Sequence, residues 1–237
     1  MELSLDGRVV LVTGANGGLG QEFVRQALDR GARRVYATTR TPRAWDDARI
    51  VPVLLDVTDP DAVVHAARTA DDVDLVVNNA GTGSAEDRSI TTGSEETLRY
   101  VFETNFFGAL RVAKAFAPVL AANGGGTLLN VLSAASWISV PTGYAASKAA
   151  MWSASNSLRV ELQGQGTQVV GLHVGLVDTP MTVGLDAPKT SAASVVEQAY
   201  DGIADGALEV LADQLARDLK SRLSSPVEDL YAWAASL

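Results

Sequence analysis

Short runs of apolar residues alternate with longer segments of helical periodicity along almost the whole chain. The apolar runs predict strands at residues 8–14, 34–40, 50–59, 73–81, 126–133 and 167–175, with a possible seventh at 208–212. These runs are continuously apolar rather than alternating, which is typical of parallel strands that are covered on both faces. We therefore expect a buried parallel sheet.

The segments between the strands carry apolar residues three and four positions apart, as amphipathic helices do. They predict helices at 18–32, 59–70, 94–120, 144–163 and 191–204. The tail, 216–237, predicts one helix, a break at Pro226 and an aromatic end. Strand and helix alternate without a linker, so we predict one α/β domain over residues 1–237: a Rossmann-like doubly wound parallel sheet of about seven strands, with helices on both faces.

Composition narrows the function classes. The chain has 237 residues and a net charge of −9, which argues against nucleic acid or an anionic membrane as partner. It has no cysteine and only two histidines, so we expect no disulfide, no thiolate chemistry and no metal site. The first residues lead directly into a strand, and no apolar run reaches the ~18 residues of a membrane helix. We expect a cytoplasmic protein.

A glycine-rich stretch, TGANGGLG at residues 13–20, closes the first predicted strand and opens the first helix. Glycines at 14, 18 and 20 permit a tight turn, a close approach of pyrophosphate to the backbone, and close packing of the helix on the sheet. The start of the helix then faces the phosphates. This pattern predicts a dinucleotide site.

The end of the second strand indicates which dinucleotide binds. An acidic residue there would favour NAD, but the sequence ATTRTPR at residues 37–43 contains none. Arg40 can offer a planar guanidinium to a 2′-phosphate, and Thr39 can donate a hydroxyl hydrogen bond to it. We expect NADP(H) to be favoured over NAD(H). Asp56 and Val57, at the end of the third strand, are placed to flank an adenine.

Tyr144 and Lys148 are four residues apart in an alanine-rich helix, so they share one face. A free tyrosine has a pKa near 10, too high for a base at neutral pH. A nearby ammonium favours the phenolate, and so does a positively charged oxidised nicotinamide. The pair therefore predicts acid–base chemistry with a lowered Tyr144 pKa.

The motifs together resemble the short-chain dehydrogenase/reductase family, in its shorter oxidoreductase branch. The matches are TGxxxGxG from Thr13, NNAG at residues 78–81, a helix asparagine at Asn105, a strand serine at Ser133, and YxxxK at Tyr144 and Lys148. The resemblance implies that Tyr144 is the general acid for carbonyl reduction and that Ser133 binds the carbonyl oxygen. It implies that Lys148 lowers the Tyr144 pKa and binds the nicotinamide ribose, and that Asn105 holds a water of a proton relay.

The strand ends and the resemblance together assign the cofactor contacts. They are Gly14, Asn16, Gly18, Leu19, Gly20, Thr39, Arg40, Asp56, Val57, Asn79, Ala80, Gly81, Tyr144, Lys148, Gly175, Val177 and Thr179. Thr179 would bind the carboxamide. Val174 stands where the family usually has proline, so the backbone there is expected to be less fixed. Ser136 and Ser139 are rivals of Ser133, which fits the NxxS pattern better.

The expected substrate pocket is apolar, and no Lys or Arg is placed to hold a carboxylate near Tyr144. Its predicted lining is Ala135, Trp137, Val140, Leu176 and Met181. The segment from 182 to 194 is predicted to be a substrate lid. We expect reduction of neutral apolar ketones or aldehydes, or oxidation of the matching alcohols. A 3-oxoacyl thioester reductase and a non-catalytic NADP-binding sensor remain alternatives, and the small residues of helix 144–163 suggest a homo-oligomer, a dimer or tetramer.

Overall fold

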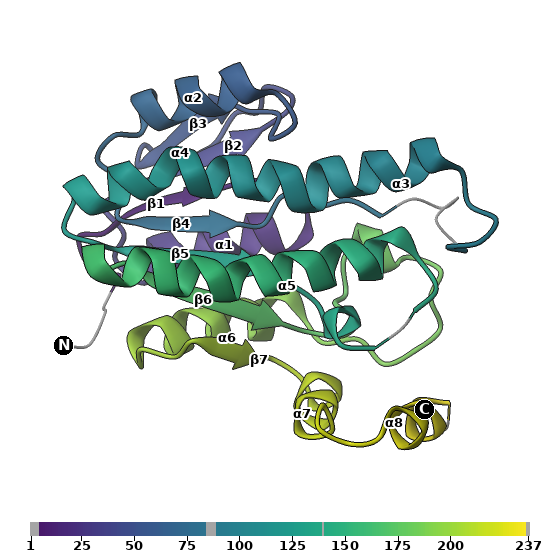
Figure 1. The fold of residues 1–237 in the computed structure, drawn as a ribbon. Helices are drawn as coiled ribbons and strands as arrows, with labels where there is room; N and C mark the ends of the chain where they lie inside the picture. Colours follow the sequence, from purple (N-terminus) through teal and green to yellow (C-terminus); the bar gives the residue numbers. More distant parts are fainter. Residues whose placement is uncertain (1–4, 84–88, 139, 236–237) are drawn as a thin grey trace.

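The computed structural model describes residues 5–83, 89–138 and 140–235, and its centre is one parallel sheet (Figure 1). The seven strands lie in the order β3-β2-β1-β4-β5-β6-β7 and all pair in parallel. They span Val9–Val12 (β1), Arg34–Thr39 (β2), Ile50–Leu54 (β3), Leu75–Asn78 (β4), Thr127–Val131 (β5), Gln168–His173 (β6) and Glu209–Leu211 (β7). The predicted fold class is confirmed. Pro52 is tolerated because β3 is an edge strand.

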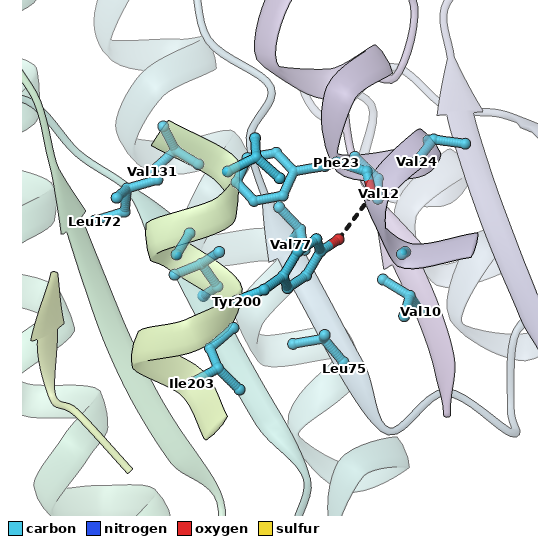
Figure 2. Close-up of a cluster of buried hydrophobic side chains, with 14 of the residues drawn as sticks. Val10, Val12, Phe23, Val24, Leu75, Val77, Val131, Leu172, Tyr200 and Ile203 are labelled. Carbon is cyan, nitrogen blue, oxygen red and sulfur yellow. Dashed lines mark hydrogen bonds between the residues drawn. The ribbon is translucent and has the colours of Figure 1, made fainter. Parts of the chain in front are cut away.

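Helices cover both faces of the sheet (Figure 1). One face packs on α1 (Gly18–Asp29) and α6 (Ala192–Ala204), the other on α2 (Pro60–Thr69), α4 (Ala109–Ala122) and α5 (Gly143–Leu162). Figure 2 shows how α6 packs against α1 on the first face. The Tyr200 ring of α6 meets the Phe23 ring of α1 edge-on, and the Tyr200 hydroxyl donates to the Phe23 carbonyl at 2.8 Å. A buried phenol thereby fills an apolar core and keeps a hydrogen-bond partner.

The long helix predicted at 94–120 contains a π-helical turn. It consists of α3 (Glu95–Phe102), the π-helical η1 (Glu103–Gly108) and α4. Ser94 caps its start by accepting a hydrogen bond from the Thr97 amide at 3.1 Å. The periodicity of the apolar residues does not reveal the wider turn, because a π turn shifts the helical face by only one residue. Asn105 lies in this turn and is buried.

The tail forms two helices rather than one helix and an irregular end. They are α7 (Gln214–Ser221) and α8 (Val227–Ala234), separated at Pro226 (Figure 1). Short turns complete the chain at η2 (Ala134–Ser136), η3 (Gln163–Gln165) and η4 (Pro180–Thr182). A third, smaller apolar cluster joins α7 and α8 to η2 through Ala134, Trp137, Ala216, Leu219 and Leu230.

Across the residues that the structure describes, no helix has both the length and the apolar character needed to span a membrane. Within the same residues, no three His, Asp or Glu side chains gather in a way that would hold a metal ion.

Candidate active site

Two adjoining cavities open at the carboxyl ends of the strands. The first has a volume of about 980 Å³ and the second about 600 Å³, and both are lined by Gly14, Gly17, Ala80 and Gly81. These residues follow β1 and β4, the neighbouring strands at which the chain order of the sheet reverses. Ligands of doubly wound sheets bind at this switch point.

The loop between β1 and α1 has the backbone geometry that only glycine adopts readily. Gly14 and Gly18 have φ values of 66° and 39°. A Cβ on Gly20 would lie 2.1 Å from the Gly14 carbonyl oxygen, so any side chain there would displace the loop. The start of α1 is thereby held against the turn, with its first amides facing the cleft.

Two side chains hold this loop in place. The Thr13 hydroxyl accepts hydrogen bonds from the amides of Asn79 and Ala80, each at 2.9 Å. The Asn79 side chain donates to the carbonyls of Thr13 at 2.8 Å and Gly14 at 3.2 Å. The NNAG motif thus ties the end of β4 to the glycine turn, and Asn79 also lines the second cavity.

These observations are what a dinucleotide requires. The loop offers a helix start, a turn without side chains and an adjoining cavity, which together suit a pyrophosphate and the two nucleosides that it links. The predicted contacts Gly14, Asn16, Thr39, Arg40, Asp56, Val57, Ala80 and Gly81 line the first cavity. Gly14, Gly18, Leu19, Asn79, Ala80, Gly81, Tyr144, Lys148, Gly175, Val177 and Thr179 line the second. The exception is the buried Gly20, which packs behind the loop.

The end of β2 presents Arg40 as an exposed side chain on the first cavity. Thr39 differs from the expectation: it is buried, and its hydroxyl donates to the Thr41 carbonyl at 2.6 Å. That hydrogen is therefore not directed at a phosphate. Thr41, which sequence reasoning missed, also lines the cavity, and its hydroxyl accepts a hydrogen bond from the Asn16 side-chain amide at 3.3 Å.

Asp56 stays ionised where β3 ends. Burial raises the pKa of this carboxyl. Hydrogen bonds from the Thr58 amide and hydroxyl, together with the charge of Arg40, lower the pKa by more, so the net shift is downward. The two Thr58 bonds are 2.9 and 2.7 Å long. Asp56 and Arg40 therefore form one polar edge of the first cavity.

Ser133, Tyr144 and Lys148 meet on the wall of the second cavity. Ser133 follows β5, and its hydroxyl accepts from the Ala135 amide at 3.1 Å and donates to the Val174 carbonyl at 3.4 Å. Tyr144 lies in the first turn of α5, which Thr142 caps. Ser133 acts on Tyr144 through its side chain and lowers the pKa of the phenol. A carbonyl oxygen placed between two such hydroxyls would accept a bond from each.

Lys148 lies beneath Tyr144 and is almost fully buried. Its Nζ is 5.6 Å from the centre of the Tyr144 ring and donates to the Val131 carbonyl at 2.8 Å. Burial lowers the pKa of Lys148 to about 8. Burial raises the pKa of Tyr144, although the Ser133 side chain opposes it. The net direction for the chain by itself is thus opposite to the expected lowering, since desolvation of the phenol dominates, and the effect of Lys148 on the Tyr144 pKa stays a prediction.

The buried Lys148 predicts a pH-dependent stability. Its pKa is about 8 in the folded protein against 10.5 for a free lysine, so the unfolded chain binds more protons between these values. Stability then rises with pH in this window. Between pH 7 and 10, we expect the wild type to gain about 2–3 kcal/mol relative to Lys148→Met. Urea unfolding of both proteins at each pH measures the difference, and parallel curves would contradict the burial of a charged lysine.

Asn105 fixes the backbone that follows β4 through side-chain hydrogen bonds. Its side chain accepts a bond from the Thr82 amide at 2.7 Å and donates to the Thr82 carbonyl at 2.8 Å and the Ser147 hydroxyl at 3.0 Å. A Cβ on Gly81 would lie 3.4 Å from its oxygen and 3.6 Å from the Lys148 Nζ, so both side chains converge on Gly81. Asn105 does not line either cavity. It pins the chain that follows β4.

Ser136, the first rival of Ser133, is buried away from both cavities. Ser139, the second rival, lies outside the described residues. Of the two described serines, Ser133 is the one that lines the second cavity with Tyr144.

The segment after β6 is held firmly despite Val174. The Val174 carbonyl accepts from the Ala134 amide at 2.8 Å, and the Gly175 amide donates to the Asp213 carboxylate at 2.6 Å. The methyl group of Thr179 lies 2.7 Å from the place of a Cβ on Gly18, so this segment closes over the glycine turn. Asp213 supplies an anchor for this segment from a distant part of the chain, and the effect of the missing proline stays a prediction.

The second cavity is mainly apolar, as expected, but its lining differs in one residue. Ala135, Val140, Leu176 and Met181 line it, whereas Trp137 does not. The Trp137 ring turns away and stacks on His173 at 3.8 Å between centroids. Residues that were not assigned to the pocket from sequence also line it, among them Ile138, Leu185 and Leu215. Leu185 belongs to the segment predicted as a lid, whose base is fixed by bonds between Thr190 and the backbone of Leu176 and Asp178.

Comparison with known proteins gives one consistent family. The model of that family, described as short chain dehydrogenase, matches residues 8–190. The chain is 35% identical over 217 residues to a 1-deoxy-11-beta-hydroxypentalenate dehydrogenase of Streptomyces exfoliatus, covering 84% of this chain and 78% of the relative. It is 32% identical over 192 residues to a galactitol 2-dehydrogenase (L-tagatose-forming) of Cereibacter sphaeroides, covering 76% and 75%.

A solved structure agrees over nearly the full length. The short chain dehydrogenase from Burkholderia cenocepacia, crystallised in complex with NADP, superposes with a TM-score of 0.91 at 33% identity. The match covers 97% of this chain and 98% of that one.

Proposed function

Because the chain belongs to the short-chain dehydrogenase/reductase family, it is an oxidoreductase of CH–OH and C=O groups, and we propose that it is an NADPH-dependent reductase of neutral apolar ketones or aldehydes. The observation that carries the proposal is the placement of Ser133, Tyr144 and Lys148 on the wall of an apolar cavity that adjoins the glycine loop. A carbonyl group in that cavity meets two hydroxyls at one end and apolar side chains elsewhere.

Each residue of the site has a separate role in carbonyl reduction. NADPH, when bound, would be the source of the hydride for the carbonyl carbon. The Ser133 hydroxyl holds the carbonyl oxygen, and Tyr144 gives that oxygen a proton as the negative charge develops. The Tyr144 phenol is protonated at neutral pH, as an acid must be, although burial raises its pKa and so makes the proton harder to release. Lys148 holds a positive charge below the ring, and Asn105 keeps the chain after β4 in position.

The cofactor preference follows from charge at the edge of the first cavity. Arg40 is exposed there, and no carboxylate follows β2 before residue 46. A guanidinium forms strong charge-assisted bonds with a phosphate. Asp56, which Arg40 stabilises as an anion, lies at the end of the neighbouring strand. The NADP in the Burkholderia cenocepacia structure agrees with this preference.

Arg40→Asp is expected to reverse the cofactor preference. The change removes a charge-assisted bond and places a second carboxylate near Asp56, so NADPH should bind about 10-fold more weakly or worse. NADH should gain relative to it. The measurement is the ratio of kcat/KM for the two cofactors with one ketone. Arg43→Asp is the matched control, because Arg43 stacks on Trp45 at 4.4 Å and lines neither cavity. An unchanged ratio in Arg40→Asp would refute the assignment.

The apolar lining supports the substrate class. Relatives of similar identity are named for different substrates, hydroxypentalenate and galactitol, so kinship alone does not select one. Lys148 is the only lysine or arginine among the described residues that line the second cavity, and its Nζ is bound to a backbone carbonyl. A charged substrate would lack a partner there.

The proposal is tested by following consumption of NADPH, and separately of NADH, with a panel of neutral alkyl and aryl ketones. Turnover with NADPH supports it. A carboxylate or a 3-oxoacyl thioester that is reduced far better than every neutral ketone would overturn the substrate class. Tight binding of NADPH without turnover of any carbonyl compound would favour a cofactor-binding sensor.

We also infer a homo-oligomer that packs through the long helix α3–α4 and α5. Val160 is an exposed large apolar residue of α5, with 75% of its surface accessible, and Phe107, 47% accessible, also borders the first cavity. The small residues of α5, among them Ala146, Ala149 and Ala150, allow a close approach of a second copy. Light scattering distinguishes a dimer or tetramer from a monomer. The lid at 182–194 and the cytoplasmic location stay predictions.

A further inference from the structure

The C-terminal helix α7 reaches the second cavity through one side chain. Leu215, in its first turn, lines the cavity together with residues of η2 and η4. A Cβ on Gly175 would lie 2.9 Å from the Leu215 Cδ2, so the leucine packs directly on the segment that follows β6. This contact places residue 215 beside both the candidate cofactor segment and the apolar space for substrate.

Asp213 fixes the start of the helix against the same segment. One carboxylate oxygen accepts from the Ala216 amide at 2.8 Å and caps α7, while the other accepts from the Gly175 amide at 2.6 Å. Each oxygen thus has its own donor, and two elements are joined by one side chain. The position of Leu215 is therefore tied to the backbone of Gly175.

The other end of α7 is fixed to the same wall. Lys220 pairs with Glu209 of β7 and lies 5.1 Å above the Trp137 ring and 5.6 Å from the Trp152 ring. Trp137 in turn stacks on His173, whose Nδ1 donates to the Ser133 carbonyl at 3.2 Å. The helix is consequently held at both ends by residues that also contact β6 and the Ser133 segment.

We propose that α7 forms a wall of the substrate site, in which Leu215 limits the size of the bound carbonyl compound and Asp213 positions it. This inference rests on the proposed function for the nature of the ligand. Because α7 is held at both ends by an ion pair, ring contacts and a helix cap, it moves little when a ligand binds. The shape of this wall therefore limits which ketones fit the cavity. Changing the volume at residue 215 then changes which ketones fit.

The test compares a small and a large neutral ketone, cyclohexanone and 2-decalone. Their binding to the enzyme that holds NADPH is followed by NADPH fluorescence, and their reduction by kcat/KM. Leu215→Phe should weaken 2-decalone about 10-fold relative to cyclohexanone, and Leu215→Ala should shift the ratio the opposite way. NADPH affinity itself should change little. The matched control is Leu223→Ala, a half-buried leucine of the same apolar cluster that lines neither cavity.

The outcomes separate the two proposals. An unchanged ratio of 2-decalone to cyclohexanone in both Leu215 variants, or an equal shift in Leu223→Ala, would overturn the proposal that α7 forms a wall of the substrate site. Ketones that bind with the expected ratios but are not reduced would support the wall and refute the reductase. A wild-type protein that neither binds nor reduces the two ketones would refute both.

Asp213 is tested as a positioning residue by Asp213→Ser. Serine keeps an acceptor for the Ala216 amide but is too short to reach the Gly175 amide. The start of α7 then stays capped but is no longer bonded to the segment after β6. We expect the ratio of the two ketones to shift in the direction of Leu215→Ala. Thermal unfolding is measured alongside. A loss of stability with an unchanged ketone ratio would show that Asp213 only stabilises the fold and would overturn its role.

Discussion

Tyr144→Phe is expected to reduce kcat/KM for ketone reduction by about 10²–10⁴-fold, the usual contribution of a positioned acid. The phenylalanine keeps the ring that packs near Lys148, and it removes the hydroxyl whose pKa Ser133 lowers. The carbonyl oxygen would still be held by Ser133, but no proton would be available as charge develops on it. NADPH binding, followed by fluorescence, should stay within about threefold of the wild type because the change is a loss of chemistry rather than of fold.

The control for this result is Tyr231→Phe. Tyr231 lies on α8 and lines neither cavity, so the same loss of a hydroxyl there should leave kcat/KM unchanged. Retention of more than a tenth of the wild-type rate in Tyr144→Phe would mean that another group supplies the proton. In that case the pairing of Ser133 and Tyr144 would have only a binding role.

The parts of the site that could be predicted from sequence are those carried by contiguous motifs. Ser133 and Tyr144 end a strand and open a helix, and parallel strands deliver such ends to one edge of the sheet. The same logic placed Gly14, Asn79 and Arg40 on one cleft. In each case the element type alone sets the position of the residue, and the apolar runs made the element type plain.

The parts that could not be predicted depend on contacts between distant residues. Trp137 follows Ser133 by four positions and was assigned to the cavity, but His173 of β6 and Lys220 of α7 draw its ring to the other side. Leu215 was missed because nothing in its neighbourhood indicates that α7 folds back over Gly175. That placement requires the Asp213 bond, which spans 38 residues.

The direction of the Tyr144 pKa was mistaken for a related physical reason. The spacing of Tyr144 and Lys148 shows that they share a face, which makes a charge effect plausible. It does not show how deeply the pair is buried, and burial decides which protonation state is favoured. Here it favours a neutral phenol and a lysine that loses its proton more easily.

Gly20→Ala is expected to weaken NADPH binding by about 100-fold. The added Cβ would lie 2.1 Å from the Gly14 carbonyl oxygen and 2.9 Å from the Asn79 side-chain nitrogen. The first of these atoms is backbone, so the start of α1 must move away from the turn. Overpacking of this kind costs about 1–3 kcal/mol, and the upper figure corresponds to about two orders of magnitude in affinity. The amides that face the phosphates would move with the helix.

Gly164→Ala provides the matched control, since Gly164 is exposed and a Cβ there meets no atom within 4 Å. Both variants add one methyl group, so general effects on expression and stability are compared directly. We expect normal NADPH binding in Gly164→Ala, and in Gly20→Ala a lower midpoint of thermal unfolding together with the loss of affinity. Wild-type NADPH affinity in Gly20→Ala would show that the turn adapts without cost. The tight packing of Gly14, Gly20 and Asn79 would then not be what positions the cofactor.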